Sequence, residues 1–263
     1  MTSKFLSVFF SFLIISLIVS GQSEQLVINI SPLEEQGILT FENPKGSIKV
    51  TGYDGDVIVV TGTMRHQESE KQTASGMRKL DQNLIDLTAE VNGNIVILQS
   101  SSLGRTIDFD IKVPKQFSLN LKSLDNGSIE IININGEIEV ENTNGDITLD
   151  GISGSAVLST VYGKISANFR EVNPSSPMMF SSFEGEISIT LPASVKAKLK
   201  MRSEKGEILS DFEIDQTGRQ PVVKNLGDKQ VYSLENWIVG TVNSGGPEYI
   251  ISSYTGNIIL RKK

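Results

Sequence analysis

The stretch NGEIEVENTNGDITLDG, residues 135–151, contains one short phrase twice. Each copy has a glycine, an acidic residue and two aliphatic residues separated by one position. Aliphatic residues that alternate with polar ones predict a β-strand with one buried face, and glycine allows the positive φ that a tight corner requires. Asparagine before the glycine, as at Asn135 and Asn144, also tolerates that conformation. Each copy therefore predicts a corner followed by a short strand.

The phrase recurs through much of the chain. Glycines stand nine residues apart at positions 127, 136, 145, 154 and 163. Six more copies begin at Gly46, Gly55, Gly93, Gly185, Gly206 and Gly256. From Gly127 onward, the glycines at positions 145, 163, 185 and 206 follow one another at intervals near twenty residues. Such an interval fits one full coil of a solenoid, with nine residues as about half a coil. We therefore predict an all-β, single-domain parallel β-helix or solenoid built from G-x-I-x-(I/V/L) repeats.

An antiparallel sandwich is the alternative, because short strands at regular spacing also fit that architecture. Constant spacing of one glycine phrase favours the solenoid, since stacked corners must be alike. The step of fifty residues from Gly206 to Gly256 indicates an insertion. In the solenoid, Ile147 is expected to be buried between coils.

The N-terminus has the layout of a secretory signal peptide. Lys4 precedes an apolar run over residues 5–19, and the small residues Ser20 and Gly21 follow. We assign residues 1–21 to a signal peptide and residues 22–263 to one exported domain, with an uncleaved anchor as the alternative. The expected location is the periplasm, the cell surface or the extracellular space, without membrane insertion after cleavage.

Composition argues against several kinds of site. The chain has 24 Lys and Arg against 31 Asp and Glu, a formal net charge of −7, and no basic stripe that would suit nucleic acid. With no cysteine and with His66 as the one histidine, zinc and a Ser-His-Asp triad are disfavoured. Calcium-binding rolls share the nine-residue period but need GGxGxD, which this chain lacks. No metal or cofactor is predicted.

Two carboxylates are candidates for a catalytic pair. Asp108 and Asp110 project from the same side of a predicted strand and could serve as general acid and base. Their alternation with Ile107, Phe109 and Ile111 favours the solvated face of a half-buried strand instead. We therefore predict no catalytic residues.

Aromatic residues are scarce, at 6% of the chain, but several stand beside repeat glycines. Tyr53, Tyr162, Phe183 and Tyr254 have this position. They are expected to line one corner edge, either as a packing ladder or as a ligand surface. Tyr162, Phe183 and Tyr254 are the residues we assign to a binding surface.

The chain resembles the bacterial putative adhesin family, a β-helical domain of unknown function. The resemblance rests on residues 107–131 and 135–169, on VNSGGPEYIISSYTGNIILRKK at residues 242–263, and on GSIKVTGYDGDVIVVTG at residues 46–62. It implies an exported protein of the bacterial envelope and brings no catalytic residues. The segments Met64–Asn83 and Asp211–Lys229 interrupt the repeats; we expect the first as an exposed excursion and the second as a long loop.

The functional expectation is a noncatalytic protein for adhesion, surface scaffolding, or protein or glycan binding. An envelope-sensing module that signals through a membrane partner is one alternative. A glycan-active β-helix enzyme is another, and it would require a groove of clustered acids with aromatic platforms. The oligomeric state is left open.

The signal-peptide assignment predicts that the exported chain begins at Gln22. Intact-mass analysis of the protein from an envelope fraction should give the mass of residues 22–263. A mass that includes Lys4 would favour the uncleaved anchor.

Overall fold

The computed structural model describes residues 23–30, 36–65, 85–101, 104–217, 222–226, 229–233 and 236–263. The predicted signal peptide, His66 and residues 66–83 of the first interruption lie outside these ranges. Within them the regular elements are the strands β1–β22, without a helix, and so without one long and apolar enough to cross a membrane.

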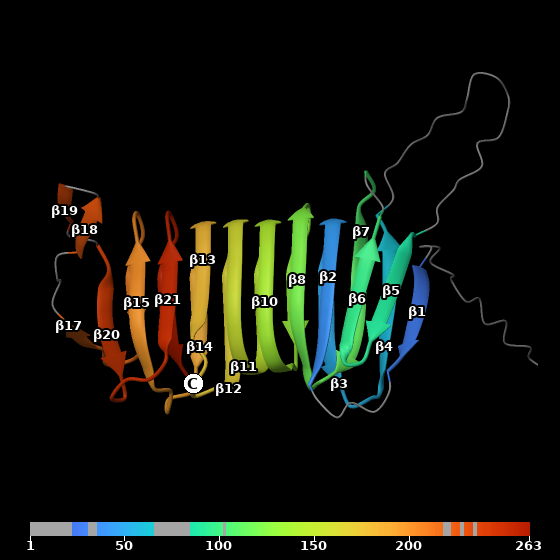
Figure 1. Ribbon diagram of the computed structural model, residues 1–263, viewed down its shortest axis with the longest axis horizontal. Coiled ribbons are helices and arrows are strands. Elements are labelled where there is room, and N and C mark those ends of the chain that lie inside the picture. Colours follow the sequence, from blue (N-terminus) through green and yellow to red (C-terminus); the bar gives the residue numbers. More distant parts are fainter. Residues whose placement is uncertain are drawn as a thin grey trace, which may run out of the picture.

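The strands form two layers that enclose a common core (Figure 1). The front layer, from left to right in Figure 1, consists of β20 (Ile238–Val242), β15 (Ala197–Ser203), β21 (Glu248–Ser253), β13 (Met178–Glu184), the second part of β11 (Ile147–Tyr162), β10 (Asn135–Asn144), β8 (Phe117–Asp125), β2 (Gly37–Lys45), β6 (Ile95–Ser100) and β5 (Leu87–Asn92).

The back layer follows the same axis. It consists of β16 (Ile208–Ser210), β22 (Ile258–Lys262), β14 (Ile187–Leu191), β12 (Ile165–Val172), the first part of β11, β9 (Ile129–Ile132), β3 (Ile48–Tyr53), β7 (Ile107–Pro114), β4 (Val57–Met64) and β1 (Ser23–Asn29). β17 (Asp215–Thr217) pairs with β20, and β18 (Val222–Leu226) forms a hairpin with β19 (Lys229–Ser233).

The expected all-β, solenoid-like architecture is confirmed. In the centre, strands of successive coils pair in parallel and in register, as Gly136 does with Gly154, eighteen residues later. The antiparallel sandwich is therefore wrong for the centre of the molecule. Antiparallel pairs do close both ends, where β4 lies between β1 and β7, and β20 lies between β15 and β17. The stack therefore departs from a β-helix that is parallel throughout.

The order of the coils in space differs from their order in the chain. The last coil, β21–β22, lies between β13–β14 and β15–β16. The first coil, β2–β3, likewise lies between β6–β7 and β8–β9. The repeat spacing predicted that the coil of Gly206 would follow that of Gly185, and this was wrong, because the coil of Gly256 is inserted between them.

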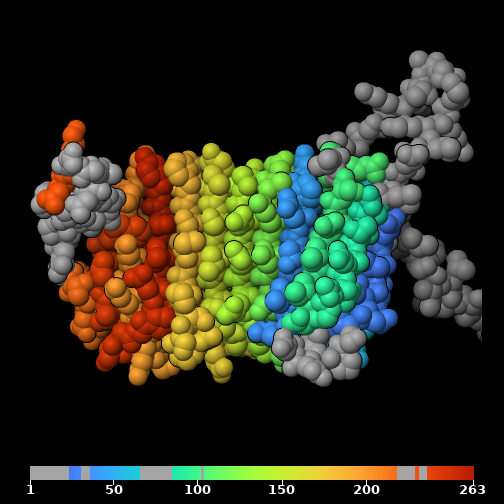
Figure 2. Space-filling model, in the orientation of Figure 1, coloured from blue at the N-terminus to red at the C-terminus, as the bar shows by residue number. Residues whose placement is uncertain are grey.

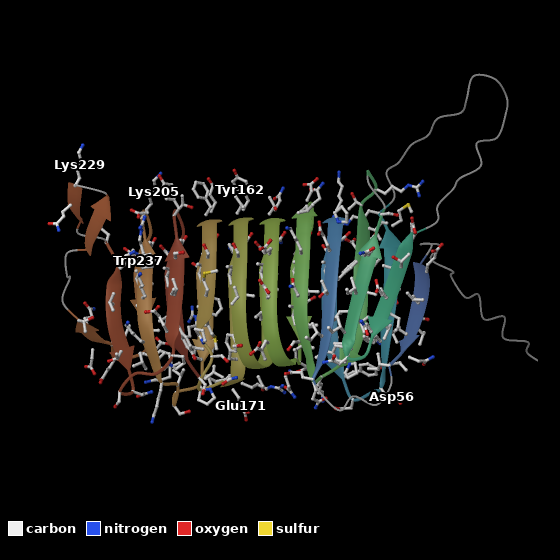
Figure 3. The ribbon with its side chains drawn as sticks, in the orientation of Figure 1. Asp56, Tyr162, Glu171, Lys205, Lys229 and Trp237 are labelled. Atoms are coloured by element: carbon white, nitrogen blue, oxygen red, sulfur yellow. The ribbon has the colours of Figure 1, made fainter. Side chains whose placement is uncertain are left out.

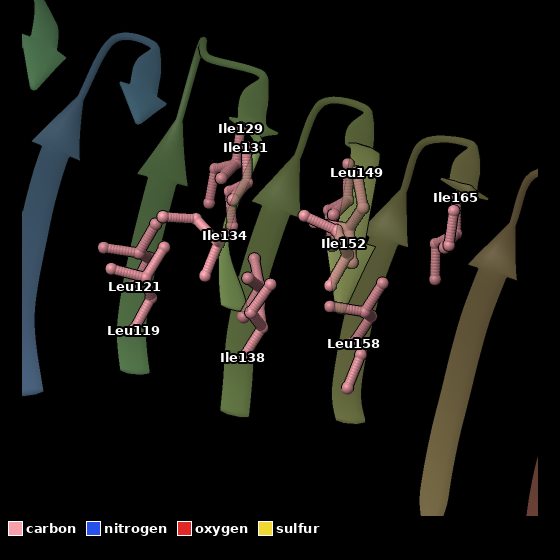
Figure 4. Packing of buried hydrophobic residues seen from close by; sticks show 14 of the residues in the cluster. Leu119, Leu121, Ile129, Ile131, Ile134, Ile138, Leu149, Ile152, Leu158 and Ile165 are labelled. Carbon is pink, nitrogen blue, oxygen red and sulfur yellow. The ribbon is translucent and has the colours of Figure 1, made fainter. Parts of the chain in front are cut away.

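The core lies between the two layers and is filled by inward-facing aliphatic and aromatic side chains (Figure 4). Ile147 is fully buried, as predicted. It is in register with Ile129 of β9 and Ile165 of β12, and Figure 4 shows both of these residues among the buried side chains of the core. Every coil contributes alternating residues to this column, because period two sends one face of each strand inward.

Stacked glycines form the upper corner, where the chain turns from the front layer to the back. A Cβ on Gly163 would lie 2.1 Å from the carbonyl oxygen of Gly145, and one on Gly145 would lie 2.1 Å from that of Gly127. The stack includes Gly46, Gly127, Gly145, Gly163, Gly185, Gly256 and Gly206. The sequence pattern predicts a positive φ at these glycines, but several of them have no positive φ. The requirement that all of them share is close contact between the backbones of neighbouring coils.

A buried polar ladder runs beside this corner. In most coils, a side chain three residues before the glycine donates a hydrogen bond to the carbonyl of the neighbouring coil's glycine. Thr160 Oγ1 donates to Gly145 O at 3.2 Å, and Ser182 Oγ donates to Gly163 O at 3.0 Å. The same bond is made by Asn142, Ser253 and Ser203. Ser123, four residues before Gly127, donates in the same way to Gly46 O at 3.2 Å. These bonds satisfy carbonyls that the turn leaves outside the strand ladders.

Three expectations need correction. Gly136 and Gly154 do form a second stack at the lower corner, so the nine-residue unit is half a coil as expected. Gly93, by contrast, lies in the β5–β6 hairpin rather than at a coil corner. Gly55 lies between β3 and β4, where the pairing is not that of a coil. The segment Asp211–Lys229, expected to be a loop, contains β17 and β18.

The glycine stack gives the first stability prediction. Gly163→Ala should lower the free energy of unfolding by about 2–4 kcal/mol, because its methyl group overlaps backbone atoms that cannot move without separating two coils. Gly93→Ala is the control: nothing lies within 4 Å of its Cβ, so only the positive φ should cost about 1 kcal/mol. Chemical unfolding followed by circular dichroism measures both, and equal losses would contradict the role of the contact.

The core also holds a hydroxyl without a hydrogen-bond partner in the structure. Tyr249 is 1% exposed, and its Oη makes no hydrogen bond to the described residues. Burial also raises the pKa of Tyr249. Tyr249→Phe should therefore raise the free energy of unfolding by about 1 kcal/mol, since it removes a buried polar atom and keeps the ring. Tyr249→Leu serves as the control that loses ring packing, and destabilisation by the phenylalanine variant would show that the hydroxyl is satisfied.

Candidate binding surface

A row of exposed apolar side chains follows the upper corner of the front layer. We name it the corner strip. It consists of Leu124, Val161, Tyr162, Phe183 and Tyr254. These residues follow the last buried position of their strands, where the chain leaves the sheet for the glycine corner. The in-register pairing of β8, β10, β11, β13 and β21 carries the row from coil to coil.

Phe183 and Tyr254 form the β13–β21 end of the corner strip. Their ring centroids are 4.9 Å apart and their planes differ by 2°, so the rings are stacked. Phe183 is 48% exposed and Tyr254 is 40% exposed, which leaves ring surface open to solvent. Lys205 Nζ lies 4.9 Å from the centroid of Tyr254, in a cation–π contact. The structure thus brings together two of the three residues that the sequence assigned to a binding surface.

Tyr162 lies on the next coil, 51% exposed, and projects from the upper end of β11 (Figure 3). It is in register with Glu184 rather than with Phe183, so it extends the strip without joining the ring stack. Tyr53 does not belong to this edge. It ends β3 at the lower corner, where its hydroxyl donates to Val57 O at 2.8 Å. The expectation that all four aromatic residues share one edge is wrong for Tyr53.

Three residues of the site were missed in the sequence. Leu124 and Val161 were not recognised because they read as ordinary members of alternating strands. Lys205 precedes Gly206 and was passed over as part of a polar turn. The signal that would have found them is their position one to three residues before a stacked glycine of the upper corner.

The two carboxylates that are candidates for a catalytic pair lie beside residues of neighbouring strands. Arg65 binds Asp108 through Nε and Nη2, both at 2.6 Å, and the backbone N–H of Ser47 donates to Asp108 at 2.8 Å. The hydrogen bond with Asp108 raises the pKa of Arg65. Asp110 lies on the outer face of β7, in register with Lys49 of β3. Asp108 is therefore engaged in joining β7 to its neighbours, whereas Asp110 is exposed on the outer face and Lys49 pairs with Glu130 at 2.9 Å.

The acidic residues that follow glycines do not converge. Asp146 accepts a hydrogen bond from the backbone N–H of Lys164 at 2.7 Å, which ties two coils together. No group of three or more potential metal ligands occurs in the part of the chain that the structure describes. The acidic residues after the glycines thus do not form a metal site within the described residues.

Solved structures of other proteins share the fold. The structure of a putative cell adhesion protein from Clostridium sporogenes is similar over 92% of this chain and 100% of that one, with 12% identity and a TM-score of 0.50. This likeness shows the fold alone.

Two further structures are less similar. A putative adhesin from Bacteroides fragilis aligns over 92% of this chain and 98% of its own, with 13% identity and a TM-score of 0.43. A putative lipid binding protein from Parabacteroides distasonis aligns over 91% and 97%, with 12% identity and a TM-score of 0.30. No curated protein matches the chain.

A family model matches residues 18–234, which is most of the sequence. The resemblance that the repeats indicated is thereby confirmed. The chain belongs to the family described as Toastrack DUF4097.

Proposed function

We propose that this chain is an exported, noncatalytic surface protein that acts in adhesion or scaffolding by binding a glycan through the corner strip. The observation that carries the proposal is the exposed stack of Phe183 and Tyr254. Folded proteins generally bury aromatic surface, so two stacked rings that both keep surface open to solvent favour a ligand that covers them.

The surroundings of the stack suit a sugar. Sugar rings present a face of C–H groups that packs on aromatic rings and an edge of hydroxyls that needs hydrogen-bond partners. Ser181 and Ser252 lie two residues before Phe183 and Tyr254 on the same face, with their hydroxyl oxygens 3.3 Å apart. Lys205 adds a cation beside the Tyr254 ring. The apolar rings, the row of hydroxyls and the cation thus lie on adjacent strands at the same end of the front layer.

The noncatalytic part of the proposal rests on the carboxylates. Asp108 is held by Arg65, and glycan cleavage by two carboxylates requires groups free to exchange protons and to face a bond between them. The name of the Clostridium sporogenes protein is compatible with adhesion but belongs to that protein. Export is supported by the apolar run near the N-terminus.

Binding should depend on the two stacked rings. Phe183→Ala and Tyr254→Ala should each weaken binding of residues 22–263 to a glycan array about three- to tenfold, because each removes an aromatic contact of about 0.5–1.5 kcal/mol. Leu209→Ala is the matched control, since Leu209 is equally exposed but lies on the back layer. Binding that survives the double aromatic variant would contradict the proposed surface.

The same protein tests for catalysis. Incubation with the glycans that it binds should leave them intact by mass spectrometry. Turnover that is abolished by Asp108→Asn or Asp110→Asn would overturn the noncatalytic proposal and favour the glycan-active enzyme.

A further inference from the structure

Below the corner strip, the outer face of the front layer has an ordered charge pattern over five adjacent strands. Their order is β15, β21, β13, β11 and β10, with β13 in the middle. The outward residues of β15 are Lys198, Lys200 and Arg202, and those of β10 are Glu137, Glu139 and Glu141. A basic column and an acidic column therefore lie at equal distances on either side of β13.

Between these columns, the outer residues of β21, β13 and β11 carry no charge in two adjacent rows. One row consists of Ile250, Met179 and Val157, in register with Lys200 on one side and Glu139 on the other. The other consists of Ser252, Ser181 and Ser159, in register with Arg202 and Glu141. Met179 and Val157 are among the exposed large apolar residues of the protein. We name these five strands' outer residues the central patch; Figure 2 shows its surface uncovered.

From this pattern we propose that the central patch binds a second copy of the same chain, face to face, about a two-fold axis that runs along β13. Such an axis exchanges left and right across the patch and keeps each row level. It places Lys200 opposite Glu139 of the second copy, Arg202 opposite its Glu141, and Met179 opposite its Met179. A two-fold axis perpendicular to the strands would instead place basic column on basic column.

The charges on the patch are only partly neutralised within one copy. Lys198 pairs with Glu248 at 3.2 Å, Glu141 pairs with Lys122 at 3.3 Å, and Arg202 pairs with Glu204. Lys200 Nζ lies 4.7 Å from the Trp237 ring centroid. Among the described residues, Glu137 and Glu139 take part in no ion pair, and Glu139 accepts a hydrogen bond from Asn120 at 3.4 Å. The middle row, Lys200 to Glu139, thus offers the least compensated charges to a second copy.

The size of the patch sets the strength of the association. Five strands about 4.8 Å apart and six residues of about 3.3 Å give roughly 20 Å by 20 Å, or about 400 Å² per copy. About 800 Å² in total is below the range of stable specific complexes, so only a weak, transient dimer is expected, with dissociation at about 100 µM. The same axis would bring the corner strips of both copies to one rim. Ser181 and Ser252 would lie in the interface, so self-association would compete with a ligand for their hydroxyls and leave the rings of the corner strip open.

Charge reversal tests the geometry. Sedimentation velocity of residues 22–263 should show a monomer–dimer equilibrium at about 10–500 µM. Glu139→Lys and Lys200→Glu should each raise the dissociation constant at least tenfold, because each variant faces like charges. An equimolar mixture of the two variants should dimerise again, since basic columns then meet acidic columns on both sides. Glu171→Lys and Lys164→Glu, outside the patch, are the matched controls and should behave as the wild type.

A zero-length carbodiimide cross-link gives an independent measurement. Within one chain, Lys200 and Glu139 are four strands apart, about 19 Å, which is too far for direct coupling. A Lys200–Glu139 peptide linked between isotope-labelled and unlabelled copies would therefore support the proposal. A wild type that stays monomeric over the whole concentration range, or single variants that associate as well as the wild type, would overturn it. Because these measurements use no glycan, their failure is distinct from failure of the proposed function.

Discussion

The contact between glycine backbones at the upper corner is the constraint on which the rest of the structure depends. Coils can lie at strand spacing all the way around only if the turns also approach to that distance, and a Cβ at Gly127 or Gly185 would overlap the carbonyl of the glycine one coil away. Once the glycines are stacked, the strands on both sides are in register. That register places aliphatic residues over aliphatic residues in the core and lets Thr160 and Ser182 reach the carbonyls of the preceding corner.

The central coils could be predicted from the sequence because this constraint is local. A glycine every nine residues marks both corners, and period two identifies Ile147 as buried. The order of the coils could not be predicted, because the phrase at Gly256 is as good a neighbour for Gly185 as the phrase at Gly206. Choosing between them depends on the insertion that contains β17–β20, whose antiparallel pairing with β15 closes the end of the stack. Nothing in the local phrase encodes that choice.

The candidate surface could likewise be predicted only in part from the sequence. Tyr162, Phe183 and Tyr254 could be identified because they adjoin stacked glycines, while Tyr53 adjoins glycines that are not part of the upper stack. The stack of Phe183 on Tyr254 joins residues seventy-one positions apart and follows only from the placement of the last coil. The charge columns of β15 and β10 are equally hidden in the sequence, since β21 must lie between β13 and β15 before they become equidistant from β13.

The placement of the first and last coils also has a consequence for stability. In a simple solenoid the terminal coils have one neighbour and fray first, because each repeat is held only by those beside it. Here β2–β3 and β21–β22 each have parallel partners on both sides, so the first and the last coil along the chain are each held between two coils. The strands that do end the stack are joined to it by antiparallel pairing, as β1 is to β4 and β20 is to β15. Long-range pairing must form before these coils can be enclosed, so this topology should fold slowly. Once folded, it should resist opening from the ends.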